Sequence, residues 1–426
     1  MARTHPLLVG ACMTLLAAAL GGCRGESPQR APAAPRERAP APDDAEIERL
    51  RSLPYAGGSP AARDEPTGVV HADPARACPG YRLYEVPELG RADLNDVQGE
   101  IVHDWHRQPG EKWQHAELLP NGDLLVVGQA DQQATGAVDG PVPAFVLRFD
   151  WTGRLLWSRA LPAHHDIEVT PQGKLLVLTM QARREPSIHA ELDVRDDQLT
   201  LLEPDGTPIA SHSVLDAVRS NPDAFPLRPA KPSRVDGPLW VDLFHANSVE
   251  WMHRPELFGR DRLYGPDNIL VSFRHQNRIA VFNWPANEVV WSWGRDELAG
   301  PHDAQVLEGG NILVFDNGLG RGWSRVVEVD PLAGRIVWEY RATPPESFFT
   351  ASKGSAQRLP NGNTLIAESD KGRAFEIDPA GETVWEYVCP HRLGDGAQRA
   401  AIGRMVWHPA AAIEPLLGPN VTSPAR

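Results

Sequence analysis

The sequence predicts an all-β protein folded as a six-bladed β-propeller, and three observations support this prediction. The 426 residues include 37 Gly, 40 Pro and 13 Trp, a composition that favours short strands joined by turns, because Gly and Pro interrupt helices. A segment made of a turn-forming pair, two apolar residues and a Trp recurs along the chain, and Ser211 replaces the Trp in one weaker copy. These segments end at Trp105, Trp157, Ser211, Trp291, Trp338 and Trp385. The last three are spaced 47 residues apart, a period typical of repeat architectures.

Each repeat supplies a strand, a turn and another strand. The turns include PNGD at 120–123, EGGN at 308–311 and PNGN at 360–363. A radial array of four-stranded sheets fits so many short strands, because it leaves few exposed strand edges. A solenoid or stacked sandwiches would leave the Trp spacing unexplained. The wide interval from Trp157 to Trp291 holds two units plus inserted loops at roughly 181–240 and 252–267, which we expect at the rim of a binding site.

The N-terminal region reads as a signal and a tether. Residues 1–22 combine an early Arg, an apolar run too short to span a bilayer and small residues before Cys23, the pattern of a secretory signal peptide. Leu20 to Cys23, LGGC, resembles the lipobox of bacterial lipoproteins. This implies lipidation of Cys23 and an extracytoplasmic, lipid-anchored protein, at the outer membrane or periplasm of a Gram-negative cell; a cleaved signal with an incidental Cys is the alternative.

Composition and hydropathy then divide the rest of the chain. Residues 23–77 are rich in Pro, Ala and charge, a composition that predicts a disordered tether. We expect the propeller over 78–412 and a C-terminal tail over 413–426.

Charge and motifs exclude several function classes. The formal net charge is -14 and no stripe of Lys and Arg is present, so a nucleic-acid partner is not expected. The sequence contains no G-x-S-x-G, no P-loop lysine motif and no G-x-G-x-x-G after a strand, so serine-hydrolase, nucleotide and dinucleotide functions lack support. We expect no cofactor.

Three histidines begin strands that should line the axial channel of a propeller. They are His165 in HDIEV, His245 in HANSVEW and His302 in HDAQV. His165 lies six residues before Pro171, and His302 lies six residues before Glu308, which holds the same place in its turn. The repeat therefore predicts that both histidines occupy equivalent positions in their units. A single His is most often structural, but three at matched positions indicate a site. His164 should point away by alternation, although the doubled His leaves that choice open.

Arg274 also lies at a repeated position, because it follows the Asn of its turn by the same number of residues as Asn317 follows the Asn of its own turn. Three imidazoles could hold a zinc ion with an open position. An arginine aimed at the same space favours an anion instead, which a guanidinium grips bidentately. The sequence therefore favours an anion site, with no metal, and leaves a metal-dependent hydrolase and a non-catalytic anion-binding propeller as alternatives.

The strings HHDIEV, HANSVEW, NILVSFRHQN and GPHDAQVLEGGNILVFDNG resemble the signature segments of the bacterial arylsulfotransferase family, whose members use no nucleotide sulfate donor. The resemblance covers about Gly80 to Tyr387 and implies a six-bladed propeller. It also implies transfer of a sulfuryl group from an aryl sulfate donor to a phenolic acceptor through a sulfated histidine. By motif, His302 corresponds to the nucleophile. The residues that correspond to the groups around the sulfuryl moiety are His165, His245 and Arg274, with Asn247, Asn317 and His164 as further substrate-binding candidates.

Two cysteines remain after the signal and the lipid site. Cys78 lies at the start of the first repeat and Cys389 directly after the last one. An oxidising compartment permits a bridge that would clasp the ends of the propeller. The sequence leaves this disulfide and two free thiols equally open.

Overall fold

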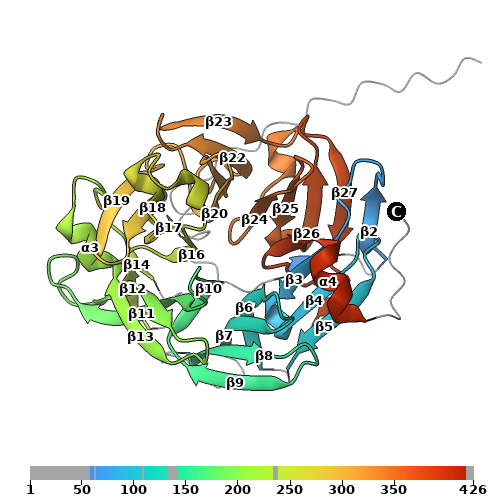
Figure 1. The fold of residues 1–426 in the computed structure, drawn as a ribbon, viewed down its shortest axis with the longest axis horizontal. Coiled ribbons are helices and arrows are strands. Elements are labelled where there is room, and N and C mark those ends of the chain that lie inside the picture. Colours follow the sequence, from blue (N-terminus) through green and yellow to red (C-terminus); the bar gives the residue numbers. More distant parts are fainter. Residues whose placement is uncertain (1–57, 62–63, 108–109, 132–141, 234–237, 419–426) are drawn as a thin grey trace, which may run out of the picture. The chain divides into compact units, whose positions relative to one another are not determined.

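The computed structural model describes residues 58–61, 64–107, 110–131, 142–233 and 238–418. Within these residues, strands form seven sheets. Six of the sheets have four to six strands, and we name each after its strand nearest the centre in Figure 1, β30, β6, β10, β16, β20 or β24. The small seventh sheet consists of β1 (Ser59–Pro60), β29 (Gln398–Arg399) and β28 (Arg392–Leu393).

In each large sheet, four strands pair in the order in which they occur along the chain, except that β30 comes from the C-terminal end of the described region; β2 and the pair β14 and β15 are further additions. The β30 sheet holds β30 (Met405–His408), β3 (Tyr81–Val86), β4 (Arg91–Asn95) and β5 (Ile101–His106). The β6 sheet holds β6 (Glu111–Leu118), β7 (Leu124–Ala130), β8 (Ala144–Phe149) and β9 (Leu155–Ala160). The β10 sheet holds β10 (Ala163–Val169), β11 (Leu175–Arg184), β12 (Asp193–Leu202), β13 (Pro208–Ser213), β14 (Pro232–Ser233) and β15 (Trp240–Asp242).

The second half repeats this pattern. The β16 sheet holds β16 (Ala246–Trp251), β17 (Asn268–Phe273), β18 (Arg278–Asn283) and β19 (Glu288–Trp293). The β20 sheet holds β20 (Pro301–Val306), β21 (Ile312–Asp316), β22 (Arg325–Asp330) and β23 (Arg335–Tyr340). The β24 sheet holds β24 (Ser355–Arg358), β25 (Thr364–Glu368), β26 (Arg373–Ile377), β27 (Thr383–Val388) and β2 (Gly68–Ala72). The helices are short: α3 (Val214–Ser220), α4 (Ala410–Leu417), η1 (Pro87–Leu89), η2 (Pro255–Leu257), η3 (Arg262–Tyr264), η4 (Pro345–Ser347) and η5 (Ser369–Lys371).

The Trp repeat marks the same strand of each sheet. The five repeat tryptophans lie on β5, β9, β19, β23 and β27, the strands three places from the centre, and Ser211 lies on β13, the equivalent strand of the β10 sheet. The sequence repeat is therefore one sheet per unit, as expected for a propeller.

The core lies between the sheets rather than inside one layer. Six apolar clusters each join two sheets that are neighbours around the centre. For example, Trp385 of the β24 sheet and Tyr84 of the β30 sheet share one cluster, and both side chains are fully buried. The last large sheet thus packs on the first, and the large sheets surround a common centre (Figure 1), as in a propeller.

The chain closes this ring with strands from both ends of the described region, which the sequence analysis did not anticipate. Near the C-terminal end, β30 adds the innermost strand to the sheet that begins with β3, pairing Leu83 with Val406. Near the N-terminal end, β2 pairs with β27 on the outer edge of the last sheet, with Gly68 opposite Val388. The tether predicted over 23–77 is therefore wrong for its last residues, because Gly68–Ala72 gain a sheet edge to pair with.

Two other boundaries also differ from the prediction. The expected loop at 181–240 contains two regular strands, β12 and β13, because the weak repeat unit without Trp falls inside it; the true insertion is α3, β14 and β15. The tail predicted from 413 begins within α4, whose Ile413 is buried against the β30 and β6 sheets.

The predicted signal peptide, Cys23 and most of the tether lie outside the described residues. Among the residues that are described, no helix has the length and apolar character needed to cross a bilayer.

Candidate active site

The predicted site residues lie where the innermost strands break register. Antiparallel pairing shifts between Trp113 and His115 in β6, Ala163 and Ile167 in β10, Ala246 and Ser248 in β16, and His302 and Gln305 in β20. Such bulges turn side chains out of the regular alternation. The backbone is left-handed at His165 (φ 61), His245 (φ 51) and Asp303 (φ 50), which costs about 1–3 kcal/mol per non-Gly residue. Backbone strain at three residues in or directly before the inner strands points to a functional site there.

His302 is held in one tautomer. Its Nδ1 lies 2.7 Å from Asn317 Oδ1 and 3.1 Å from the Gly300 carbonyl oxygen. Because both partners are acceptors, Nδ1 carries the proton and Nε2 keeps its lone pair. Burial lowers the pKa of His302 to about 3, and the positive charge of Arg274 acts in the same direction. The imidazole is therefore neutral and can act as a nucleophile at Nε2.

Asn317 was predicted to bind substrate, but its contacts give it a different role. Its side chain is fully buried, and Nδ2 donates to the carbonyl oxygens of Thr350 (2.9 Å) and Lys353 (2.8 Å). With both donors used on the protein, Oδ1 must face His302 and accept its Nδ1 proton. Asn317 thus fixes the orientation of the His302 ring.

His245 forms a buried pair with Asp242, a residue that the sequence analysis missed. Its Nδ1 donates to Asp242 Oδ2 over 2.5 Å, and its backbone N–H donates to Oδ1 over 3.1 Å. Arg195 Nη1 also donates to Asp242 Oδ2 over 3.1 Å. Burial alone would raise the pKa of Asp242, but Arg195, His245 and His275 together hold it well below its ordinary value. Burial outweighs the effect of the Asp242 carboxylate and lowers the pKa of His245 well below its ordinary value, so the ring is neutral, with its proton on Nδ1 and a lone pair on Nε2.

His165 and His164 contact each other, so the doubled histidine is one unit. Their Nδ1 atoms lie 2.9 Å apart, and His164 Nε2 lies 3.2 Å from the Thr179 carbonyl oxygen. A neutral His164 must donate from Nε2 to that carbonyl, so its Nδ1 accepts from His165. The His165 ring meets the His245 ring edge-on, with centroids 4.9 Å apart. Burial lowers the pKa of His165 well below its ordinary value, with His245 and His164 contributing.

Arg274 faces the same space. Its side chain is buried, and Nη2 lies 3.4 Å from the Ala351 carbonyl oxygen. Its backbone N–H donates to the His245 carbonyl oxygen over 3.2 Å. Burial is the main cause that lowers the pKa of His302 and of His245, and the positive charge of Arg274 acts in the same direction on both. Asn247, another predicted substrate-binding residue, donates from Nδ2 to the Pro301 carbonyl oxygen over 2.9 Å and so links β16 to the residue before His302.

The charges around the histidines favour an anion over a metal ion. Within the described residues, the groups of Asp242, His245 and His275 lie close enough to share a metal, with ligand atoms within 4.8 Å of one another. Asp242 is already bonded to Arg195 and His245, however, and His275 Nδ1 lies 2.8 Å from the Asp242 carbonyl oxygen. A cation there would displace these bonds next to two arginines, whereas an anion finds positive charge already present.

Cys78 and Cys389, the pair that the sequence left open, are both buried free thiols. The backbone N–H of Cys78 donates to Glu376 Oε1 over 2.7 Å, and that of Cys389 donates to the Gly372 carbonyl oxygen over 2.8 Å. The ring is therefore closed by strand pairing and core packing, without a bridge between these cysteines.

The inner parts of the sheets thus bring together buried histidines in β10, in β20 and directly before β16, with Arg274 directly after β17. Imidazoles beside an arginine can bind an anion. Residues 115–389 match the family described as Arylsulfotransferase (ASST). This match spans more than half of the chain, so the protein belongs to the arylsulfotransferase family, as the motifs predicted.

Other comparisons add less. No curated protein matches this chain. A Bacteroides caccae protein of unknown function is 16% identical over 77% of this chain and 98% of its own, with a TM-score of 0.49. The periplasmic gluconolactonase of Pseudomonas aeruginosa is 12% identical over 78% of this chain and 99% of its own, with a TM-score of 0.44. These distant similarities do not bear on function.

Proposed function

We propose that the six large sheets are the blades of a six-bladed propeller and that the protein is an aryl-sulfate sulfotransferase that needs no nucleotide donor. It moves a sulfuryl group from a phenolic sulfate ester to a phenol through a sulfohistidine at His302. The observation that carries the proposal is the Nδ1–H tautomer of His302, which Asn317 and Gly300 fix and which leaves a buried, neutral Nε2. Membership of the arylsulfotransferase family supports the substrate class.

The first half-reaction forms a bond between His302 Nε2 and sulfur while the bond between sulfur and the aryl oxygen breaks. Charge spreads over the sulfuryl oxygens in such a transfer, so fixed positive charge stabilises the transition state. Arg274 supplies this charge. The leaving phenolate, with a pKa of about 10 in water, departs as the anion and takes a proton from water.

The second half-reaction reverses these steps on the acceptor. The phenolic oxygen attacks sulfur, its proton passes to an imidazole, and the S–N bond breaks to restore His302. The resemblance placed His245 among the groups around the sulfuryl moiety. The Asp242 carboxylate at its Nδ1 favours proton transfer instead, because that charge stabilises the imidazolium. His165 completes the same wall of the site.

The direct test is release of a fluorescent phenol from its sulfate ester, measured with and without an added phenol. We expect release that saturates with donor and rises with acceptor, because the acceptor discharges the sulfated enzyme. Stabilisation of the protein by the sulfate ester without release would favour a non-catalytic anion-binding propeller. Release that a chelator abolishes would favour a metal-dependent hydrolase.

We also propose that residues 1–22 are a signal peptide and that acylated Cys23 anchors the protein to a membrane on its extracytoplasmic side, at the outer membrane or periplasm of a Gram-negative cell. One acyl chain holds a protein only weakly, whereas the three chains expected on a lipoprotein N-terminus hold it firmly. In cell fractionation, the natural chain should remain with the membrane, and Cys23→Ser should be released. Equal release of both proteins would contradict the anchor.

A further inference from the structure

One set of side chains ties each inner strand to the next. Within this set, each side chain accepts a hydrogen bond from a backbone N–H of the inner strand of the next sheet. Asp166 accepts from Val249 (2.9 Å), Ser248 from Ala304 (3.2 Å), Asp303 from Ala356 (2.9 Å) and Ser355 from Met405 (3.3 Å). In each case the donor directly follows the side chain that acts as acceptor in the next sheet: Val249 follows Ser248, Ala304 follows Asp303 and Ala356 follows Ser355. Met405 follows Arg404, so Arg404 holds the next position in this series.

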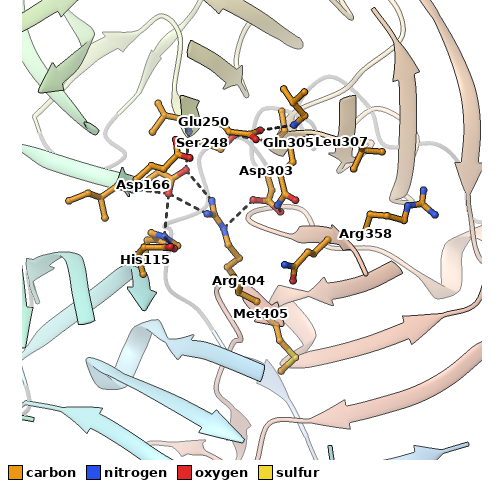
Figure 2. Close-up of a pocket in the computed structure, with 18 of the residues that line it drawn as sticks. His115, Asp166, Ser248, Glu250, Asp303, Gln305, Leu307, Arg358, Arg404 and Met405 are labelled. Carbon is orange, nitrogen blue, oxygen red and sulfur yellow. Dashed lines mark hydrogen bonds and ion pairs between the residues drawn. The ribbon is translucent and has the colours of Figure 1, made fainter. Parts of the chain in front are cut away.

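Arg404 breaks the pattern because it is a cation among acceptors. It uses three nitrogens on two carboxylates: Nη1 lies 3.3 Å from Asp166 Oδ1, Nη2 lies 3.3 Å from Asp166 Oδ2, and Nε lies 3.2 Å from Asp303 Oδ1 (Figure 2). The paired contacts with Asp166 are the bidentate geometry that an arginine makes best. Asp166 belongs to the β10 sheet and Asp303 to the β20 sheet, and the β16 sheet lies between them around the ring. Arg404 therefore connects two sheets that are not neighbours.

Both carboxylates directly follow site histidines. Asp166 comes after His165, and Asp303 comes after His302; His165 and Asp303 have left-handed backbone angles. A contact at the carboxylate is thus one residue away from a strained part of the backbone that aims a histidine. Such backbone conformations persist only when surrounding contacts hold them.

Arg404 acts from the side away from the histidines. Asp166, Asp303 and Arg404 line a cavity of about 340 Å³, together with His115, Glu168 and Glu250 (Figure 2). His165, His245 and His302 do not line it. Arg404 therefore meets the site through the two aspartates.

We propose that Arg404 is a positioning residue of the sulfuryl-transfer site: by bridging Asp166 and Asp303, it sets the spacing between His165 and His302. This inference rests on the proposed function of those histidines. A structural clasp that only closes the ring is the competing role.

The test compares Arg404→Met and Arg404→Lys with the natural enzyme in kcat, KM and melting temperature. We expect Arg404→Met to lower kcat by about tenfold to a hundredfold, the cost of misplacing a catalytic group by about an ångström. KM should change little, because Arg404 does not line the donor site. The kcat of Arg404→Lys should lie between those of Arg404→Met and the natural enzyme, because an ammonium group keeps the charge but cannot make all three contacts at once.

Two control variants match these changes. Arg358→Met removes another arginine of the same cavity, one that pairs with Glu328 over 2.9 Å and contacts neither aspartate in the described contacts. Ser355→Ala removes another member of the tying set, on a strand that carries none of the site histidines. Both should keep kcat near that of the natural enzyme.

The double variant Asp303→Asn with Arg404→Met keeps the proposal falsifiable if Arg404→Met folds poorly. It neutralises one of the two buried carboxylates that lose Arg404, so stability should recover in part while kcat stays low. Recovery of both would overturn the proposal, since Arg404 would then only neutralise charge. A folded Arg404→Met with normal kcat and a lower melting temperature would overturn it in favour of the structural clasp.

A readout that needs no turnover separates this proposal from the proposed function. In protein labelled at the histidine rings, His165→Asn and His302→Asn assign two ring signals. Arg404→Met should shift both and leave the signal of His103, which bonds to the Trp151 carbonyl oxygen outside this cavity, nearly unchanged. If the natural protein transfers no sulfuryl group, the proposed function fails while these shifts still test the positioning role; two unmoved signals would overturn that role alone.

Discussion

Replacing His302 with Asn should abolish sulfuryl transfer, even though Asn keeps a polar side chain of similar reach. The covalent route needs a nitrogen lone pair at the position of Nε2, and an amide nitrogen has none to offer. The variant should fold normally, because His302 belongs to none of the apolar clusters between sheets. The measurement is the rate of phenol release from an aryl sulfate, which should fall to the uncatalysed rate.

The intermediate itself provides the sharper measurement. Incubation of the natural enzyme with donor alone should leave a sulfuryl adduct on the peptide that contains His302, and added phenol should remove it. His165→Ala is the matched comparison, since it removes a neighbouring imidazole but leaves the nucleophile; it should slow the reaction yet still form the adduct. Intersecting initial-rate lines for donor and acceptor, with no adduct after rapid quenching, would show direct transfer and contradict the covalent route.

Replacing Arg274 with Lys should be nearly as harmful as removing the charge. The guanidinium offers several donors in one plane to the sulfuryl oxygens, whereas an ammonium keeps the charge but loses the paired grip. Loss of such transition-state stabilisation costs about 3 kcal/mol, or roughly a hundredfold in kcat. Steady-state kinetics with an aryl sulfate donor measure this effect.

The corresponding control is Arg254→Lys, because Arg254 lies in the cavity away from the histidines and donates to the Val306 carbonyl oxygen. It should keep kcat close to the natural value. A kcat for Arg274→Lys within about threefold of the natural enzyme would show that charge alone suffices, contrary to the expected role of a bidentate grip.

The sequence predicted the features that depend on local periodicity. A Trp marks the same strand in five of the six large sheets, and Ser211 marks it in the β10 sheet; the last three of these positions are 47 residues apart. The same repeat predicted His165 and His302 on inner strands, and both lie there, in β10 and β20. What the repeat could not show was the exact orientation of each side chain, since a bulge interrupts the alternation from which orientation is read.

Features that depend on long-range pairing were missed. Strand β30 pairs with β3, more than 300 residues earlier in the chain, and β2 pairs with β27 over a similar distance; neither added strand carries a copy of the repeat. Asn317 was given a substrate role because the carbonyl groups that use its amide, Thr350 and Lys353, come from a later loop. Asp242 did leave a local signal, three residues before His245.

Closure of the ring by β30 sets an order for the biosynthesis of this protein. A ribosome adds His165, His245 and His302 well before it reaches residues 405–408, so a growing chain holds every histidine of the site while β3 still lacks its inner partner. Asp166 and Asp303 also wait for Arg404. An unfinished chain therefore carries the proposed nucleophile before the contacts of Arg404 exist, and the proposed transfer requires that residues 404–408 have been made and the ring has closed.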